Sequence, residues 1–466
     1  MGTETFVRHT RIDASLGDVY DWYTRPGALE RLTPPWVRLR VVKNGGRIED
    51  GSKVLLRVGL GPLRFDWLVE HRDCVPRGQF RDVQIKGPFR QWEHLHRFEA
   101  DTDTSTYVED RIDCALPLGA FGQLFGARIL KQELERLFIY RHRIIKHDIA
   151  LHTARRVAPM SILVTGSSGL IGSALVPFLT TAGHQVVRLV RARPPSAAPN
   201  PDSQANVITW DPATGVLDPA ALEGFDAVIH LAGETLNAIR WTAEKKSRIR
   251  DSRVGGTALL CGALAKLSRP PKVLLSASAI GFYGNRGGEI LHEESEPGTG
   301  FLPEVCRAWE AATKPASEKG IRTVQMRFGV VISSAGGALA AMLPAFQVGL
   351  GGPMGTGWQY MSWITIDDVI CAIYHLLLND KIEGPVNIVG PYVATNRDFA
   401  KALGTVLERP AFVRVPGFLA RLVSGEFADD VLLASARVEP RRLLDAGFVF
   451  HYPEMEGALR QVLGRT

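Results

Sequence analysis

A glycine-rich turn between an apolar run and a helical pattern constrains this chain more than any other feature. Residues 161–165 read Ser-Ile-Leu-Val-Thr, and Gly166, Gly169 and Gly172 follow at a spacing of three. This order is typical of the strand, turn and helix that open a dinucleotide-binding βαβ unit. Gly166 permits a tight turn, Gly169 lets a pyrophosphate approach the backbone, and Gly172 lets the helix pack closely on the strand. Free N–H groups at the helix start would then face the anion.

A second apolar run, residues 184–190, follows at the distance that a βαβ crossover requires. It favours cofactor binding over the alternative of a glycine-rich turn with no ligand. Val190, Arg191 and Arg193 stand at its end without a nearby carboxylate. A carboxylate there would suit the ribose of NAD, whereas a guanidinium matches the 2′-phosphate of NADP. The sequence therefore predicts NADP rather than NAD, with a solvated basic loop as the alternative.

The length of 466 residues is too great for one ordinary core and indicates two or three domains. The formal charge of +6 is small for this length, and the chain has no polybasic tract that would argue for nucleic acid. The five cysteines lack CxxC or His-rich spacing, which argues against a disulfide framework and a zinc site, so no metal is predicted. The N-terminus carries no apolar signal core and no run reaches membrane-spanning length, so we expect a reducing cytoplasm.

Residues 1–151 show a pattern of their own, in which alternating strands precede one long helix. Gly119, Gly122 and Gly126 open that helix, and its apolar positions from Leu130 to Ile149 fall on one face. Residues 152–159 are short, polar and basic, and are predicted to be a linker that ends at Pro159. The strands are expected at residues 4–12, 37–43, 52–59, 64–73, 79–86, 92–99 and 106–115.

A long antiparallel sheet closed over by a C-terminal helix resembles the α+β helix-grip fold of the START-like superfamily, which includes polyketide cyclases and lipid-transfer proteins. In that superfamily the space between helix and sheet is often a ligand cavity. We predict an apolar ligand pocket under the helix, lined in part by Trp67, Trp92 and Phe98. The alternative is that these side chains, together with Phe80 and Phe89, simply fill the core.

From residue 160 to about 410, five strands alternate with helices and predict a doubly wound parallel α/β sheet, the Rossmann fold. Four motifs in this part resemble the extended short-chain dehydrogenase/reductase superfamily. They are Thr165-Gly-Ser-Ser-Gly-Leu-Ile-Gly172, His230-Leu-Ala-Gly233, Ser276-Ala-Ser-Ala-Ile-Gly-Phe-Tyr-Gly284 and Ser362-Trp-Ile-Thr-Ile-Asp-Asp368. Gly349-Leu-Gly-Gly-Pro-Met-Gly355 and the tail Val438–Phe448 resemble its atypical, epimerase-like branch, in which residues 411–464 would form a C-terminal module completing the substrate-side lobe.

The resemblance implies where the cofactor contacts lie. Arg253 stands where the family has a cofactor-facing asparagine, and Arg248, five residues earlier, lies too far round an ideal helix to share that face closely. Both are candidates for phosphate or ribose contact, Arg253 the better one, and Val331 would line the nicotinamide side. The remaining implied contacts are Gly166, Ser167, Gly169, Leu170, Ile171, Gly172, Val190, Arg191, Leu231, Ala232 and Gly233.

The catalytic tyrosine and lysine of that family are missing. Ser278 occupies the position of the family serine, but Leu302 and Cys306 align with the Tyr-x-x-x-Lys pair, and no tyrosine occurs between Tyr283 and Tyr360. Without a lysine that lowers the phenol pKa, the usual proton relay cannot operate. Tyr283 is the alternative proton donor, against a plain packing role. Two functions stay open: an NADP-dependent epimerase or oxidoreductase acting on an unidentified small molecule, and a non-catalytic NADP-binding sensor or scaffold with a ligand-binding N-terminal domain.

Overall fold

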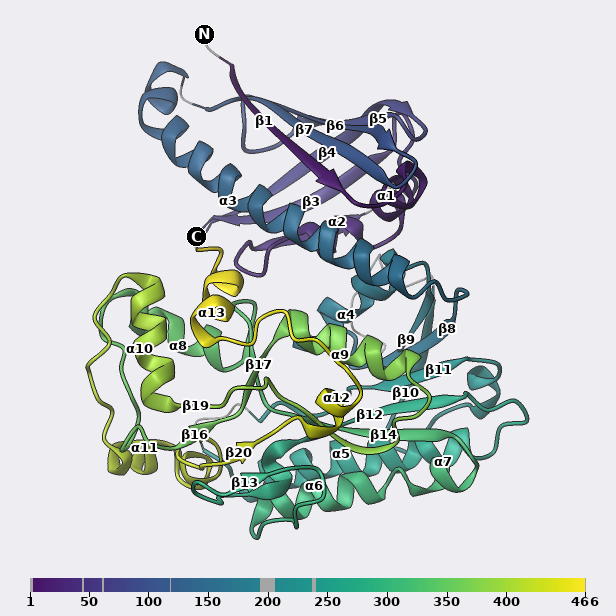
Figure 1. The fold of residues 1–466 in the computed structure, drawn as a ribbon, viewed down its shortest axis with the longest axis vertical. Coiled ribbons are helices and arrows are strands. Elements are labelled where there is room, and N and C mark those ends of the chain that lie inside the picture. Colours follow the sequence, from purple (N-terminus) through teal and green to yellow (C-terminus); the bar gives the residue numbers. More distant parts are fainter. Residues whose placement is uncertain are drawn as a thin grey trace.

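The computed structural model describes residues 3–43, 46–60, 63–117, 119–192, 206–236 and 240–465, so Arg193 lies outside the described residues. The chain forms two bodies, a helix-grip domain and a larger α/β part on which it sits (Figure 1). None of the described helices is long and apolar enough to cross a membrane.

Seven described strands of the N-terminal domain form one antiparallel sheet in the order β1-β7-β6-β5-β4-β3-β2. The long helix α3 (Gly119–Ala154) crosses one face of it (Figure 1). This confirms the predicted helix-grip fold. The other elements are α1 (Leu16–Thr24), α2 (Ala28–Leu32), β1 (Glu4–Ile12), β2 (Leu39–Lys43), β3 (Lys53–Leu60), β4 (Leu63–Val75), β5 (Gln79–Lys86), β6 (Gln91–Thr102) and β7 (Ser105–Ala115).

The core under α3 is divided into two apolar clusters. Phe98 packs with Tyr23 and the buried residues of α1, whereas Trp92 packs with Trp67 and Phe89 at the other end of the helix. A single apolar pocket lined by Trp67, Trp92 and Phe98 together does not fit this division.

A buried polar network accompanies these two clusters. Asp110 accepts hydrogen bonds from His94 and His142, at 3.0 and 2.9 Å, and its carboxylate lies 2.7 Å from Nδ1 of His96. These contacts hold the pKa of Asp110 well below its usual value although the carboxyl is buried. The interior of the helix-grip domain is therefore partly ionic, which the apolar pattern of α3 did not predict.

The α/β part contains a parallel sheet in the order β10-β9-β8-β11-β12-β14-β18, which confirms the doubly wound fold. The strand order reverses between β8 and β11, and ligands of such sheets bind at that switch point. The strands are β8 (Ser161–Thr165), β9 (Gln185–Arg191), β10 (Val207–Trp210), β11 (Ala227–His230), β12 (Val273–Ala279), β14 (Arg322–Phe328) and β18 (Gly384–Ile388).

Helices cover both faces of this sheet because its strands are apolar on both sides. Ile162 and Val164 of β8 pack with α4 (Leu170–Thr181) and α9 (Ile366–Leu378). Leu163 points the other way, into a cluster that includes α5 (Ala243–Leu264) and α7 (Lys314–Glu318). Helix α6 (Phe301–Ala311) lies beside α5.

Most of the remaining elements form the lobe beside the carboxyl ends of the strands (Figure 1), whereas α12 (Arg441–Asp445) packs on the start of β18. In the lobe α13 packs on α10, and Val438 pairs β20 with β13. The other elements are β13 (Ile290–Leu291), β15 (Val330–Ile332), β16 (Tyr360–Met361), β17 (Trp363–Thr365), β19 (Ala394–Thr395), β20 (Arg437–Val438), α8 (Gly337–Gln347), α10 (Asn396–Leu407), α11 (Gly417–Ser424) and α13 (Met455–Leu463).

The two bodies are joined by buried polar contacts as well as by the chain. Helix α3 continues to Ala154, into the predicted linker, so the non-helical link is residues 155–160. Arg31 of α2 binds Asp148 of α3 through two hydrogen bonds of 2.7 and 2.9 Å, and Asp367 of α9 through one of 3.1 Å. His152, near the end of α3, packs on Phe178 of α4.

Candidate functional site

The three glycines of the turn after β8 have different structural roles. Gly166 has a φ of +65°, and a Cβ there would lie 2.6 Å from the carbonyl of Leu231. A Cβ on Gly172 would overlap the carbonyl oxygen of Gly166 and approach Cα of Ser167 to 2.7 Å. Gly169 instead has an ordinary extended conformation, with Gly166 O as its one close neighbour at 3.2 Å. Gly166 and Gly172 are thus required by the chain itself, whereas Gly169 is exposed at the start of α4, where a Cβ would make one tight backbone contact.

The end of β11 is held against this turn by buried hydrogen bonds. The Oγ1 of Thr165 accepts from the backbone N–H groups of Leu231 and Ala232, both at 3.1 Å. His230 bridges Thr165 at 2.8 Å and Thr257 of α5 at 3.0 Å. Burial lowers the pKa of His230 to about 4, so the imidazole is neutral at physiological pH. The predicted contacts Leu231 and Ala232 are therefore fixed beside the glycine turn, while Gly233, the next residue, is exposed.

A cluster of cations surrounds Glu234, the residue after the predicted strand-end contacts. Lys245 Nζ donates to Glu234 Oε1 at 2.8 Å, and Arg248 Nε lies 3.9 Å from the same oxygen. Lys245, with Arg248 and Arg191 contributing, holds the pKa of Glu234 below its usual value. The Arg191 and Arg248 side chains are exposed. Three cations thus face one carboxylate where β9 and β11 end.

Arg248 and Arg253 of α5 reach the same region by different routes. Nη1 of Arg253 donates to the carbonyl oxygens of Glu234 and Ile249 at 2.9 and 3.1 Å, and its guanidinium lies over the ring of Trp309. Arg248 is 61% exposed and touches Glu234 from the outside. The two positions were expected not to share one helix face closely, and their long side chains nevertheless reach different atoms of the same residue, Glu234. Arg248 has the more available guanidinium.

The other predicted cofactor contacts lie around the start of α4. A Cβ on Gly337 would lie 3.3 Å from Leu170 and 3.6 Å from the carbonyl of Val331, so these two predicted residues flank one point. Ser167 is half-buried in the turn, and Ile171 is a half-buried neighbour of the core. Val190 is half-buried in β9, opposite Thr209 of β10. The structure thus brings Leu170 and Val331 together.

Ser278 is not free at the end of β12. Its hydroxyl donates to Glu310 Oε1 of α6 at 2.6 Å, and Ser278 is only 2% exposed. Arg327 of β14 donates to both oxygens of Glu310, each at 2.8 Å. The serine therefore forms part of a closed ion-pair network, which sequence reasoning missed.

Tyr283 is fully buried and belongs to the same network. Its hydroxyl donates to Asn387 Oδ1 at 2.7 Å and accepts from Nη1 of Arg327 at 2.9 Å. Burial raises the pKa of Tyr283 to about 12. The phenol holds the end of β12 to β14 and β18, an arrangement that favours the packing role over proton donation.

The positions of the missing tyrosine and lysine face the turn after β12. A Cβ on Gly281 would lie 3.4 Å from Cβ of Leu302 and 3.7 Å from Sγ of Cys306. Cys306 is buried, and burial raises the pKa of its thiol to about 12. Neither side chain supplies an acid, a base or a cation at neutral pH.

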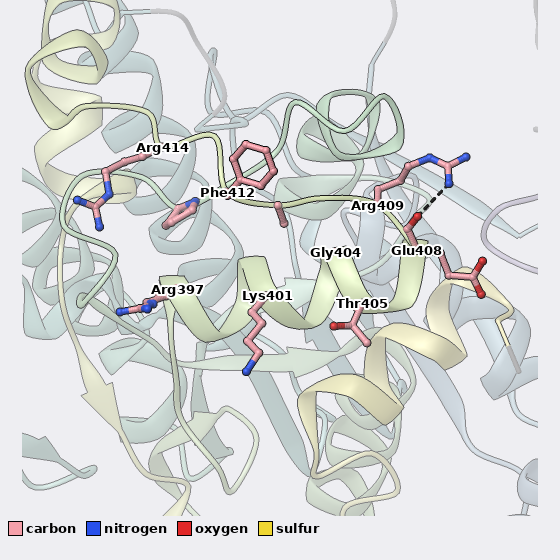
Figure 2. Close-up of a pocket in the computed structure, with 10 residues that line it drawn as sticks. Arg397, Lys401, Gly404, Thr405, Glu408, Arg409, Phe412 and Arg414 are labelled. Carbon is pink, nitrogen blue, oxygen red and sulfur yellow. Dashed lines mark hydrogen bonds between the residues drawn. The ribbon is translucent and has the colours of Figure 1, made fainter.

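A basic groove of about 770 Å³ lies elsewhere, between α10 and residues 409–414 (Figure 2). Arg397 and Arg414 stand at one end of it, and Arg409 with Glu408 at the other. Arg409 already donates to the carbonyl oxygens of Gln347 and Glu408. The groove includes none of the predicted cofactor contacts, so it is separate from the glycine turn.

Together the reversed strand order, the glycine turn and the strand ends beside it define a dinucleotide-binding Rossmann protein with a helix-grip domain at its N-terminus. Residues 162–389 match the model of the NAD dependent epimerase/dehydratase family. An epimerase family protein of Mycobacterium tuberculosis is 41% identical over 298 residues, which are 64% of this chain and 96% of that protein. The chain belongs to this epimerase family. Residues 415–462 match a domain of unknown function, DUF1731, and residues 12–138 match polyketide cyclase / dehydrase and lipid transport proteins.

Two solved structures place the domains in context. A nucleoside-diphosphate sugar epimerase from Corynebacterium glutamicum has a TM-score of 0.80 and 32% identity, covering 98% of this chain and 90% of its own. The human epimerase family protein SDR39U1 with NADPH has a TM-score of 0.58 and 33% identity, covering 65% of this chain and 99% of its own. The N-terminal helix-grip domain is thus shared with the bacterial protein.

Proposed function

We propose that the protein binds NADP at the glycine turn, with its 2′-phosphate among Arg191, Arg248 and Lys245. The observation that supports this proposal most directly is the charge around Glu234, where three cations surround one carboxylate at the ends of β9 and β11. An adenosine 2′-phosphate at that edge would take up the excess positive charge, and guanidinium groups bind phosphate with two parallel hydrogen bonds. The NADPH named in the human SDR39U1 structure supports the same choice.

Calorimetric titration of the full chain with NADPH and NADH tests this proposal. NADPH should bind more tightly, because NADH leaves the cations without their phosphate. Arg191→Ala and Arg248→Ala should each weaken NADPH binding by about 1–3 kcal/mol and leave NADH binding unchanged. Arg64→Ala, at an exposed arginine of the N-terminal domain, is the control. Equal affinities of the unmodified chain for both cofactors would rule the proposal out.

We propose further that the protein acts on a small molecule as an epimerase or oxidoreductase without a tyrosine–lysine relay. Membership of the epimerase family supports a reaction. The alternative is a non-catalytic NADP sensor or scaffold. The hydroxyl of Ser278 tied to Glu310, and the apolar Leu302 and Cys306, favour that alternative.

Turnover separates the two possibilities. The full chain is incubated with panels of carbonyl compounds and sugar nucleotides, and cofactor absorbance and product are followed. The carbonyl compounds are tested with NADPH, and the sugar nucleotides with NADP⁺, which can accept the hydride that epimerisation first removes. Consumption of NADPH, or an epimerised product, that disappears in Ser278→Ala supports the enzyme. NADPH binding without any turnover across the panels supports the sensor.

For the N-terminal domain we propose an apolar ligand, as the match to lipid-transport proteins suggests. Five half-buried apolar side chains pack against the cluster of Trp92 beside the middle of α3, and they are Phe6, Trp67, Phe89, Leu130 and Leu137. Trp67 also has a buried ring N–H without a partner among the described residues. Lipid-like and aromatic probes should quench tryptophan fluorescence of the full chain, and Trp67→Phe should reduce the change. Absence of any saturable signal would contradict this assignment.

The proposed compartment is the cytoplasm, and the five free thiols agree with a reducing environment.

A further inference from the structure

Three potential metal ligands from three parts of the chain meet where the two bodies touch. They are His147 of α3, Cys371 of α9 and His451, which precedes α13. The Nε2 atoms of the two histidines are 2.7 Å apart, and Cys371 Sγ lies 3.9 Å from Nε2 of His147. All three donor atoms lie within 4.8 Å of one another. The imidazole nitrogens thus point at a common space beside a thiol.

The surroundings orient these side chains. The other ring nitrogen of His147, Nδ1, lies 3.6 Å from Asp148, whose carboxylate is held by Arg31. Metal-binding histidines commonly face a carboxylate with their second nitrogen, which fixes the ring and makes it a better ligand. The backbone N–H of His451 donates to Asp368 at 2.8 Å, one turn before Cys371 on α9. Both histidines are therefore positioned by groups that are not themselves ligands.

We propose that His147, Cys371 and His451 bind a zinc ion. Two imidazoles and a thiolate are the donor set that zinc prefers, and three protein ligands leave one position for water. Zinc bonds of about 2.0–2.1 Å to nitrogen and 2.3 Å to sulfur place tetrahedral ligand atoms about 3.3–3.6 Å apart. The observed separations of 2.7 and 3.9 Å lie on either side of that range. Small side-chain movements therefore suffice to admit the ion.

The charge around the three residues and their positions in the chain also support a zinc site. The carboxylates of Asp148 and Asp367 lie on either side of the single guanidinium of Arg31, which leaves excess negative charge beside the cluster. The ligands come from the helix-grip domain, the Rossmann domain and the C-terminal module, so the ion would hold all three together.

Asp82, His94 and His96 form another possible cluster among the described residues. There, however, Asp110 already contacts both histidines, and His71 already binds the carboxylate of Asp82 at 2.6 Å.

Cobalt titration of the full chain, freed of metal by a chelator, tests the site. Cobalt(II) replaces zinc in such sites and gives a thiolate charge-transfer band. One equivalent should bind with that band, Cys371→Ser should abolish it, and zinc should displace the cobalt. Cys261→Ser is the control, because Cys261 is equally buried but lies in α5, away from the cluster.

His451→Ala keeps the test independent of folding, since His451 is exposed. Loss of a direct ligand should cost more than the about 10–100-fold typical of an outer contact, so cobalt affinity should fall by more than about 100-fold. His9→Ala, at another exposed histidine, should have no effect. Absence of cobalt binding, or a charge-transfer band that survives Cys371→Ser, would overturn the proposal and leave a hydrogen-bonded histidine pair.

Discussion

Replacing Glu310 by glutamine tests whether the network around Ser278 is structural. Glu310 accepts from Ser278 and, through both oxygens, from Arg327, whose side chain is 4% exposed. The glutamine keeps the shape but removes the charge that balances a buried guanidinium.

The expected loss of stability depends on which interactions Arg327 keeps in the variant. Removing one partner of a buried ion pair costs about 3–5 kcal/mol. Arg327 keeps the hydroxyl of Tyr283, the carbonyl of Glu293 and the face of Phe282, 3.5 Å from its Cζ, so the lower end applies. We expect Glu310→Gln to lower the stability of the Rossmann part by about 3 kcal/mol, or its thermal midpoint by about 6 °C.

Differential scanning calorimetry and NADPH titration on the same samples measure the outcome. Glu289→Gln is the matched control, because its pair with Arg286 is at the surface and should be worth less than about 1 kcal/mol. NADPH affinity should stay unchanged in both variants. The structural interpretation fails if Glu310→Gln melts like the unmodified chain but loses a measurable turnover, since Glu310 would then act in catalysis.

Two further predictions concern the contact between the two bodies. Both ring nitrogens of His152 are buried without partners among the described residues, and burial lowers its pKa to about 4. In the unfolded chain the imidazole titrates near 6.5, so the contribution of His152 favours folding above that pH and is lost as the pH falls toward 4. His152→Phe should therefore raise the thermal midpoint and weaken the dependence of that midpoint on pH between these values. An unchanged dependence of the midpoint on pH would contradict the assignment. Arg31→Met should leave Asp148 and Asp367 buried without a counter-ion and lower the free energy of unfolding by about 3–5 kcal/mol. The link at residues 155–160 should then become accessible to limited proteolysis. Cleavage of the variant at the same rate as the unmodified chain would show that the ion pair does not hold the two bodies.

Much of the fold could be predicted because its patterns are local. Strands 4–12 and 79–86 were predicted at their observed bounds, since one face of each strand is polar and the alternation is visible. The glycine turn also predicted the strand and the helix on either side of it, which are β8 and α4. Strands β14 and β18 were not predicted as members of the sheet, because Arg327 and Asn387 interrupt their apolar character with buried polar groups.

The site was less predictable because long-range contacts decide what each side chain does. Nothing near Ser278 in the sequence shows that Glu310 and Arg327 occupy it, and the reach of Arg248 to Glu234 depends on side-chain length rather than on helical position. The spacing of the cysteines argued against zinc, yet Cys371 meets histidines from positions 147 and 451 only after folding. Spacing rules detect clusters within one segment and do not show a cluster assembled from three segments, such as the one proposed above to bind zinc.

The most direct test of the account is NADPH binding by Gly169→Val. The backbone at Gly169 is exposed and has an extended conformation open to any residue, so the variant should fold once Gly166 O, 3.2 Å from the new Cβ, shifts by a few tenths of an ångström, which circular dichroism checks. Its side chain would nevertheless occupy the space through which a pyrophosphate approaches the start of α4. Gly457→Val, at an open position of α13, is the control. Fluorescence titration should show NADPH binding lost in Gly169→Val and kept in the control. Normal NADPH binding by a folded Gly169→Val would mean that the cofactor site is not at this turn.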